Sequence, residues 1–239
     1  MSNGKIDLTT YSRLAKNSFW ALISNISMVF ILLLTIFASR VLGDAAFGQY
    51  IFLLAITTVL ADLSVLGTTD YAGILVSRES HQTHEIVANS LGLRIPFIIL
   101  FLIISEVIAW FSMPETLLVC FLLALDWVVR TIIHLFRAVL RARNVFAVDA
   151  SVATIERLAV LFFAGGGLYF YGSLLSFAVG FLIGRLLGLT MCARAYVSLG
   201  ERLYLAFDYS MCLKLLKGGI PIGIRGLFKI ISFRIDVVM

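Results

Sequence analysis

The chain has 239 residues, of which 61% are hydrophobic and only 14% are charged, and its mean hydropathy is +1.01. A soluble globular domain carries about 25% charged residues, so this composition excludes a water-soluble fold and indicates a polytopic membrane protein. We expect the formal net charge of +5 to lie in cytoplasmic loops and not to serve nucleic-acid binding.

Apolar stretches long enough to cross a bilayer follow one another along the chain. They predict an all-α fold with a six-helix transmembrane lobe and the start of a seventh helix. The expected spans cover residues 18–38, 47–66, 86–111, 114–144, 148–169, 173–196 and 218–239. The chain then divides into a cytoplasmic N-terminal segment (1–16), the six-helix lobe (17–194), an amphipathic cytoplasmic connector (195–217) and the start of a second lobe (218–239). Because residues 237–239 leave the last apolar helix without a polar end, we expect a fragment or a truncated product.

Polar stretches separate the expected spans. A tight turn over 40–44 joins the first two, and a polar loop over 67–85 joins the second and third. The loop contains His81 and His84, but their order differs from the HExxH pattern of zinc sites, so we expect no metal. The three cysteines suggest neither a disulfide framework nor a zinc site. No cofactor is expected.

The fourth span carries a charged stripe. Asp126, Arg130, His134, Arg137 and Arg141 follow one another at spacings of four, four, three and four residues, which places them on one face of a helix. Each such charge at the bilayer centre costs about 2.5–3.5 kcal/mol on insertion scales. The stripe must therefore face a protein interior or a watery cavity.

Ionisable residues recur in the other spans as well. The candidates for a shared substrate-binding cavity are Arg94, Asp126, Arg130, His134, Arg137, Glu156, Arg157, Arg185, Arg225 and Lys229. Since arginines outnumber acids in this set, we expect a cavity of positive potential that suits phosphate or carboxylate groups. Structural alternatives stay open: Asp126 and Arg130 can neutralise each other, Glu156 can pair with an arginine of a neighbouring helix, and Arg137 can extend to the membrane surface. Asp126 or Glu156 is also a candidate to carry a coupled proton.

Two further patterns concern packing and orientation. Gly180, Gly184 and Gly188 form a strip at four-residue spacing in the sixth span, which predicts close approach of a neighbouring helix. The basic loop residues gather in the alternate connections that share a side with the N-terminus. By the positive-inside rule, the N-terminus is expected to be cytoplasmic.

Three motifs carry a resemblance to a known family. FASRVLGDAAFGQY (37–50) is similar to the join between the first two helices of polysaccharide flippases of the O-antigen (Wzx-type) kind. DLSVLG (62–67) resembles the end of their second helix, although Ser64 replaces the usual glycine, and FRIDVVM (233–239) resembles part of their seventh helix. The motif positions are Arg40, Gly43, Gly48, Asp62, Arg78, Arg234 and Asp236, and a structural role is the favoured reading for Arg40, Asp62 and Arg78.

The resemblance implies the N-terminal half of a multidrug/oligosaccharidyl-lipid/polysaccharide exporter, with a MATE-like N-lobe in the cytoplasmic membrane of a bacterium. It implies alternating access and the transfer of undecaprenyl-pyrophosphate-linked oligosaccharide between leaflets for surface polysaccharide biosynthesis. The implied partners are that lipid-linked oligosaccharide, the bilayer, a polysaccharide polymerase and a chain-length regulator.

Three alternatives remain. A multidrug or metabolite exporter of the same fold would need acidic and aromatic groups for cationic cargo. A membrane glycosyltransferase or polymerase would need a large polar loop with paired carboxylates, which the sequence lacks, so we expect a transporter and not an enzyme. The third alternative is an inactive truncated remnant or a scaffold subunit.

Overall fold

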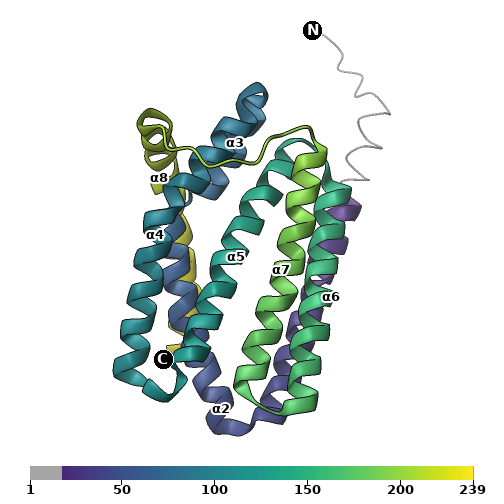
Figure 1. The fold of residues 1–239 in the computed structure, drawn as a ribbon, viewed down its shortest axis with the longest axis vertical. Helices are drawn as coiled ribbons and strands as arrows, with labels where there is room; N and C mark the ends of the chain where they lie inside the picture. The colour runs from purple at the N-terminus through teal and green to yellow at the C-terminus, as the bar shows by residue number, and fades with distance from the viewer. Residues whose placement is uncertain (1–17, 239) are drawn as a thin grey trace.

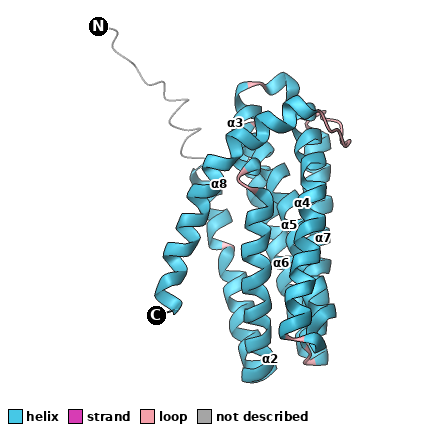
Figure 2. Cartoon of the chain, turned by 90° about the vertical axis from the view of Figure 1, so that its left-hand side faces the viewer, coloured by secondary structure: helices cyan, strands magenta, loops and turns pink. Residues whose placement is uncertain are grey.

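The computed structural model describes the backbone of residues 18–238 and the side chains of residues 18–226. Helices and short connections make up this part of the chain, with no strand (Figures 1 and 2). The elements after the first helical turns are α2 (Met28–Val65), α3 (Thr68–Arg78), η1 (Ser80–Gln82), α4 (Thr83–Ser112), η2 (Pro114–Thr116), α5 (Leu117–Ala142), α6 (Phe146–Tyr171), α7 (Leu174–Ser198) and α8 (Tyr209–Val238).

The first long helix turns back on itself. Residues 18–26 are helical and continue through a turn at Ser27 into α2. Inside α2, Gly43 has φ 72° and ψ 172°, a conformation that glycine adopts far more readily than other residues. The parts of α2 before and after Gly43 therefore form an antiparallel hairpin, whose bend lies at the bottom of Figure 1. The turn predicted over 40–44 is confirmed.

The polar loop predicted over 67–85 is wrong, because most of it is helical. The backbone changes direction at Leu66 (φ 46°) and Gly67 (φ 70°), and α3 then begins at Thr68. Ala72, Leu75 and Val76 are buried on one side of α3. The polar residues at the ends of this segment concealed its short helical apolar pattern.

Four helical stretches of the described chain are long and apolar enough to cross a membrane: Ser18–Arg78, Ser80–Ser112, Pro114–Ala142 and Leu174–Ser198. The fold is that of an all-α polytopic membrane protein, as the composition predicts. The number of spanning helices stays a prediction, because α6 and α8 are not among these four stretches.

The connection between α7 and α8 is shorter than the expected connector over 195–217. Helix α7 continues to Ser198 and α8 begins at Tyr209, so both helices take residues from it. Between them, residues 200–208 form a non-helical segment that we call the strap. It crosses the end of the bundle in Figure 1.

The two larger of three apolar clusters among the described residues lie along the bundle. One gathers around Ile133, Phe136 and Tyr196 towards the strap, and the other gathers around Tyr50 and Phe177 towards the bend of α2. On α5, α6 and α7, the residues between these two cores include the charged positions Asp126, Glu156 and Arg185. The fold therefore places a polar layer between two apolar ones.

The glycine strip of α7 lies directly against α6, as its spacing predicts. A Cβ atom on Gly180 would lie 2.5 Å from the Cα of Ala164, and one on Gly184 would lie 2.6 Å from the Cα of Val160. A Cβ atom on Gly188 would lie 2.5 Å from the Cγ of Glu156. The absence of side chains at these positions lets the two helices approach closely and brings Glu156 to the polar layer.

Candidate functional site

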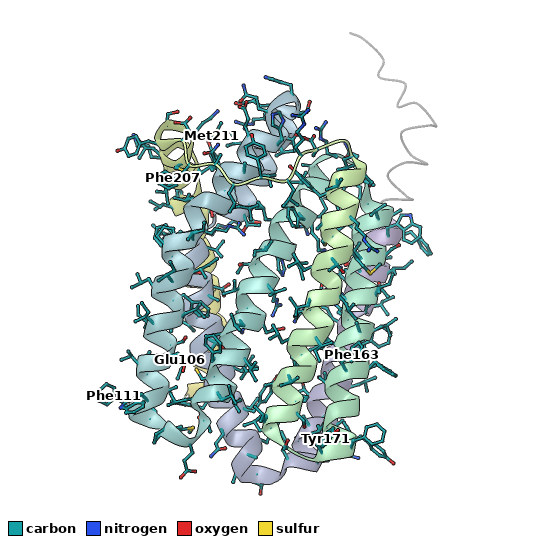
Figure 3. All side chains as sticks on the ribbon, viewed as in Figure 1. Glu106, Phe111, Phe163, Tyr171, Phe207 and Met211 are labelled. Atoms are coloured by element: carbon teal, nitrogen blue, oxygen red, sulfur yellow. The ribbon has the colours of Figure 1, made fainter. Side chains whose placement is uncertain are left out.

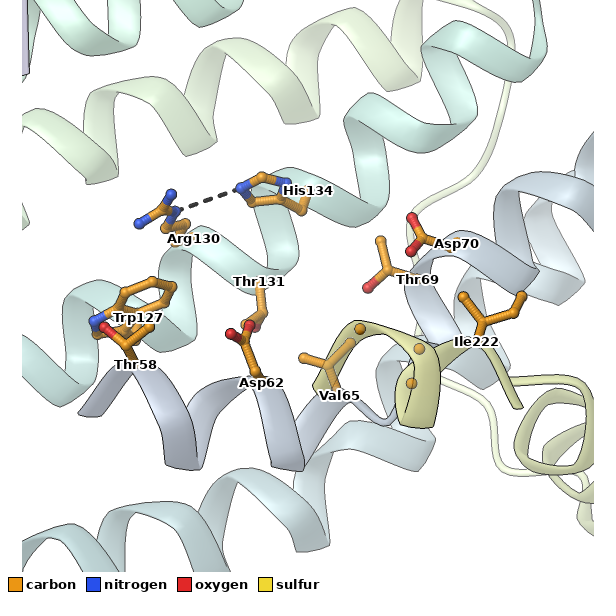
Figure 4. Close-up of a pocket in the computed structure, with 13 residues that line it drawn as sticks. Thr58, Asp62, Val65, Thr69, Asp70, Trp127, Arg130, Thr131, His134 and Ile222 are labelled. Atoms are coloured by element: carbon orange, nitrogen blue, oxygen red, sulfur yellow. Dashed lines mark hydrogen bonds between the residues drawn. The ribbon is translucent and has the colours of Figure 1, made fainter. Parts of the chain in front are cut away.

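A cavity of about 440 Å³ lies between α2, α3, α5 and α8 (Figure 4). Its described lining consists of Thr58, Asp62, Val65, Gly67, Thr69, Asp70, Trp127, Arg130, Thr131, His134, Ile222, Gly223 and Gly226. In this described lining, α5 contributes one guanidinium group, α2 and α3 each contribute a carboxylate, and α8 contributes small and apolar positions. Two members of the α5 stripe, Arg130 and His134, belong to this lining.

Arg130 is held by its own helix. Its guanidinium carbon lies 4.3 Å from the centre of the Trp127 ring, a distance at which cation and aromatic face attract each other. Its Nε donates to Nε2 of His134 over 3.4 Å (Figure 4). Within the part of the chain whose side chains are described, no carboxylate forms an ion pair with Arg130. Its terminal nitrogens therefore remain available as donors towards an anion.

The described lining of the cavity carries charges of both signs. Asp62 and Asp70 belong to its lining together with Arg130, and the carboxylate of Asp62 acts electrostatically on Arg130. The described lining thus holds two carboxylates and one guanidinium. The excess of arginine expected for the cavity is not found among these residues, because the other buried arginines that the structure describes turn towards protein partners.

Arg185 of α7 is the centre of the polar layer. Its Nε donates to Oδ1 of Asp126 on α5 over 3.1 Å, and its Nη1 donates to Oε1 of Glu156 on α6. All three side chains are buried. One guanidinium therefore joins three helices, and Glu156 pairs with an arginine of a neighbouring helix, which was one of the structural alternatives.

Arg137 forms a second buried ion pair. Its Nε donates to Oδ1 of Asp149 on α6 over 2.6 Å, and its Nη2 lies 3.4 Å from Oγ of Ser24. The guanidinium of Arg157 donates to the carbonyl oxygen of Ser24 and to the hydroxyl of Ser27. Both arginines thus attach the first helical turns to α5 and α6, away from the cavity. The side chain of Arg137 is buried in this pair and does not project from the bundle.

Arg94 of α4 is buried directly behind the cavity wall. Its Nη1 donates to the carbonyl oxygen of Thr131 over 2.7 Å, and its Nη2 donates to Oγ1 of Thr69 over 2.6 Å. Both threonines line the cavity. Arg94 has no ion-pair partner among residues 18–226, and its buried Nε has no hydrogen-bond partner there. It positions the wall and adds positive charge behind it.

The motif positions have different locations. Gly43 forms the bend of α2, and Asp62 lines the cavity. Arg40, Gly48 and Arg78 are exposed, and the structural role expected for Arg40 and Arg78 stays a prediction.

The remaining charged positions singled out from the sequence are exposed or have side chains outside the described residues. Arg141 and Arg225 are exposed. The side chains of Lys229, Arg234 and Asp236 lie outside the described residues. The part of Arg225 and Lys229 in the cavity therefore stays a prediction.

The sequence interpretation missed several lining residues, among them Trp127, Asp70 and Thr58. One signal was accessible, since Trp127 precedes Arg130 by three residues and must share its helix face. Asp70 was assigned to a loop, so nothing in that interpretation connected it to the spans. Asp149 was likewise not considered as the partner of Arg137.

Comparison with models of known protein families gives a match over most of the chain. A family model described as "Polysaccharide biosynthesis protein" matches residues 14–239. No curated protein and no solved structure matches the chain.

Proposed function

Because the chain belongs to the polysaccharide biosynthesis protein family, we propose that it is the N-terminal part of a flippase that moves undecaprenyl-pyrophosphate-linked oligosaccharide across the bacterial cytoplasmic membrane. The family includes flippases and exporters, and the helical membrane fold suggests a transporter-type protein and not an enzyme. In this proposal the protein works by alternating access, and its N-terminus is cytoplasmic.

One observation carries the proposal. Arg130 lines a cavity at the level of the membrane helices, and it forms no ion pair with any carboxylate whose side chain is described. A buried guanidinium is costly in a membrane unless an anion or a polar partner compensates it. Its planar set of donors fits the oxygens of a phosphate group. We assign the pyrophosphate of the cargo to Arg130.

The other lining groups suit the sugar part of such a cargo. The carboxylate of Asp70 and the hydroxyl of Thr58 can form hydrogen bonds with sugar hydroxyls. The lipid tail would remain in the bilayer, because the exposed surfaces of the helices are apolar.

The polar layer supports a proposal about coupling. Asp126 and Glu156 share the single guanidinium of Arg185, so the cluster carries one excess negative charge when both acids are ionised. An excess charge in a buried site is costly. We therefore retain the hypothesis that Asp126 or Glu156 carries a proton coupled to transport.

Export in cells tests the role of Arg130. The Arg130→Ala variant of the natural full-length protein would be expressed in cells that lack their own flippase, and surface polysaccharide and the amount of protein in the membrane would be measured. We expect normal insertion and a loss of surface polysaccharide. Arg141→Ala is the matched control, because Arg141 is exposed on the same helix. Normal export by a stably inserted Arg130→Ala protein would reject the cavity role.

The two carboxylates of the cavity support a second candidate function, the export of a cationic drug or metabolite. Asp62, Asp70 and Trp127 are the acidic and aromatic groups that such cargo requires. Efflux of a fluorescent cationic dye from vesicles distinguishes the two functions. Dye efflux that is lost in Asp70→Asn but kept in Arg130→Ala would favour the exporter over the flippase.

A further inference from the structure

The strap carries an apolar side that nothing in the described part of the protein covers. Leu203, Leu205, Phe207 and Tyr209 alternate along it and into the start of α8, and 51%, 64%, 64% and 74% of their surfaces are exposed. These side chains make the outer surface of the strap apolar. Figure 3 shows Phe207 projecting beside the upper part of α4.

The backbone of the strap is attached to α4. The N–H of Ala206 donates to the carbonyl oxygen of Ala88 over 3.3 Å, and the N–H of Asp208 donates to Oδ1 of Asn89 over 2.6 Å. The carbonyl group of Ala206 occupies the space that a side chain on Gly92 would need. The backbone of the strap therefore lies close against α4, while its apolar side chains are exposed.

Both ends of the strap are also held. Glu201 forms an ion pair with Arg143 of the α5–α6 junction, and its Oε2 lies 3.8 Å from Nδ1 of His84. At the other end, the hydroxyl and the backbone N–H of Ser210 donate to the carboxylate of Asp208 and lower the pKa of that group. The exposed apolar side is thus part of an anchored segment.

The position of the strap along α4 indicates which surroundings its exposed apolar side chains contact. The strap crosses α4 at Ala88–Gly92. The apolar exposed surface of α4 begins within one turn, at Ile95, and continues through Ile99 and Ile103. The strap therefore lies beside the point where the exposed apolar surface of α4 begins.

We propose that the strap is a membrane-interface anchor, with Leu203, Leu205, Phe207 and Tyr209 inserted into the boundary between headgroups and acyl chains. Aromatic and aliphatic side chains suit this region. The exposed cation Arg202 in the strap complements anionic lipid headgroups. The anchor fixes the connection between α7 and α8 at the membrane surface.

Quenching of a fluorescent label tests the anchor without any transport assay. The variants Leu205→Cys and Phe207→Cys would be labelled with an environment-sensitive dye and reconstituted into vesicles of phosphatidylethanolamine and phosphatidylglycerol. The native cysteines are buried and would be replaced by alanine. Ser77→Cys is the control, because Ser77 is exposed in the last turn of α3, which extends beyond the strap in Figure 1.

We expect nitroxide-labelled lipid to quench both strap labels strongly and aqueous iodide to quench them weakly, with the reverse order for Ser77→Cys. Strong quenching of the strap labels by iodide would overturn the proposal by placing the strap in water. Protection from both quenchers would overturn it as well, because another protein surface would then cover the strap.

Discussion

The Nε of Arg185 on α7 lies 3.1 Å from Oδ1 of Asp126 on α5, in a layer where both side chains are buried. Glu156 on α6 accepts a further hydrogen bond from the same guanidinium. Arg185 therefore holds three helices together, whereas Arg130 on α5 lines the cavity.

The first prediction concerns the stability of this layer. Arg185→Ala leaves two buried carboxylates without their cation, and removal of one partner from a buried ion pair costs about 3–5 kcal/mol. We expect a marked fall in the free energy of unfolding, measured for the purified protein in detergent by thermal or denaturant unfolding.

The control for Arg185 lies on the same helix. Arg194 is exposed, so Arg194→Ala should leave the free energy of unfolding nearly unchanged. The triple variant Arg185→Met, Asp126→Asn, Glu156→Gln removes all three charges together and should recover most of the loss. If Arg185→Ala unfolds like Arg194→Ala, the ion cluster does not stabilise the bundle.

The second prediction uses two glycines that should respond with opposite sign. Gly184→Ala places a Cβ atom 2.6 Å from the backbone of Val160, and such overpacking costs about 1–3 kcal/mol. A Cβ atom on Gly166 would meet no neighbouring atom within 4 Å, so Gly166→Ala should stabilise its helix by about 0.5–1 kcal/mol. Thermal unfolding of both variants checks the signs, and stabilisation by Gly184→Ala would contradict the close packing of α6 on α7.

The third prediction concerns the attachment of the strap. Glu201 binds Arg143 and approaches His84, so Glu201→Ala should loosen the strap. We expect faster cleavage by trypsin after Arg202, which is exposed, as measured by mass spectrometry of the fragments.

Glu115 provides the control for this experiment, because it is exposed in η2, far from the strap in sequence. Glu115→Ala should leave the rate of cleavage after Arg202 unchanged. Equal rates in Glu201→Ala and in the unmodified protein would show that the ion pair does not hold the strap.

The sequence predicted the helical class and the close approach at Gly184 because these depend on local patterns. Hydropathy and small-residue spacing are properties of one helix, and they persist whatever the neighbours are. The prediction of a polar loop over residues 67–85 was wrong because the local apolar pattern there is weak. Ala72, Leu75 and Val76 form a helical side that is too short to stand out between polar ends.

The charged stripe of α5 shows where sequence reasoning ends. At about 100° per residue, Arg137 is offset from Asp126 by about 20°, Arg130 by about 40° and His134 by about 80°. The structure divides this face: Asp126 and Arg137 meet α6 and α7, while Arg130 and His134 meet the cavity. Spacing along one helix identifies the residues that share a face. Only the packing of the neighbouring helices decides which of these residues form ion pairs and which line the cavity.

Binding of a pyrophosphate-bearing lipid to the purified protein tests the central claim most directly. The measurement would titrate a polyprenyl-pyrophosphate-linked oligosaccharide into nanodiscs that hold the unmodified protein, Arg130→Ala or the exposed control Arg141→Ala. A hydrogen bond to a charged group contributes about 1.5–3 kcal/mol, so we expect Arg130→Ala to raise the dissociation constant about tenfold or more. We expect Arg141→Ala to bind like the unmodified protein. Unchanged binding by a folded Arg130→Ala variant would contradict the account.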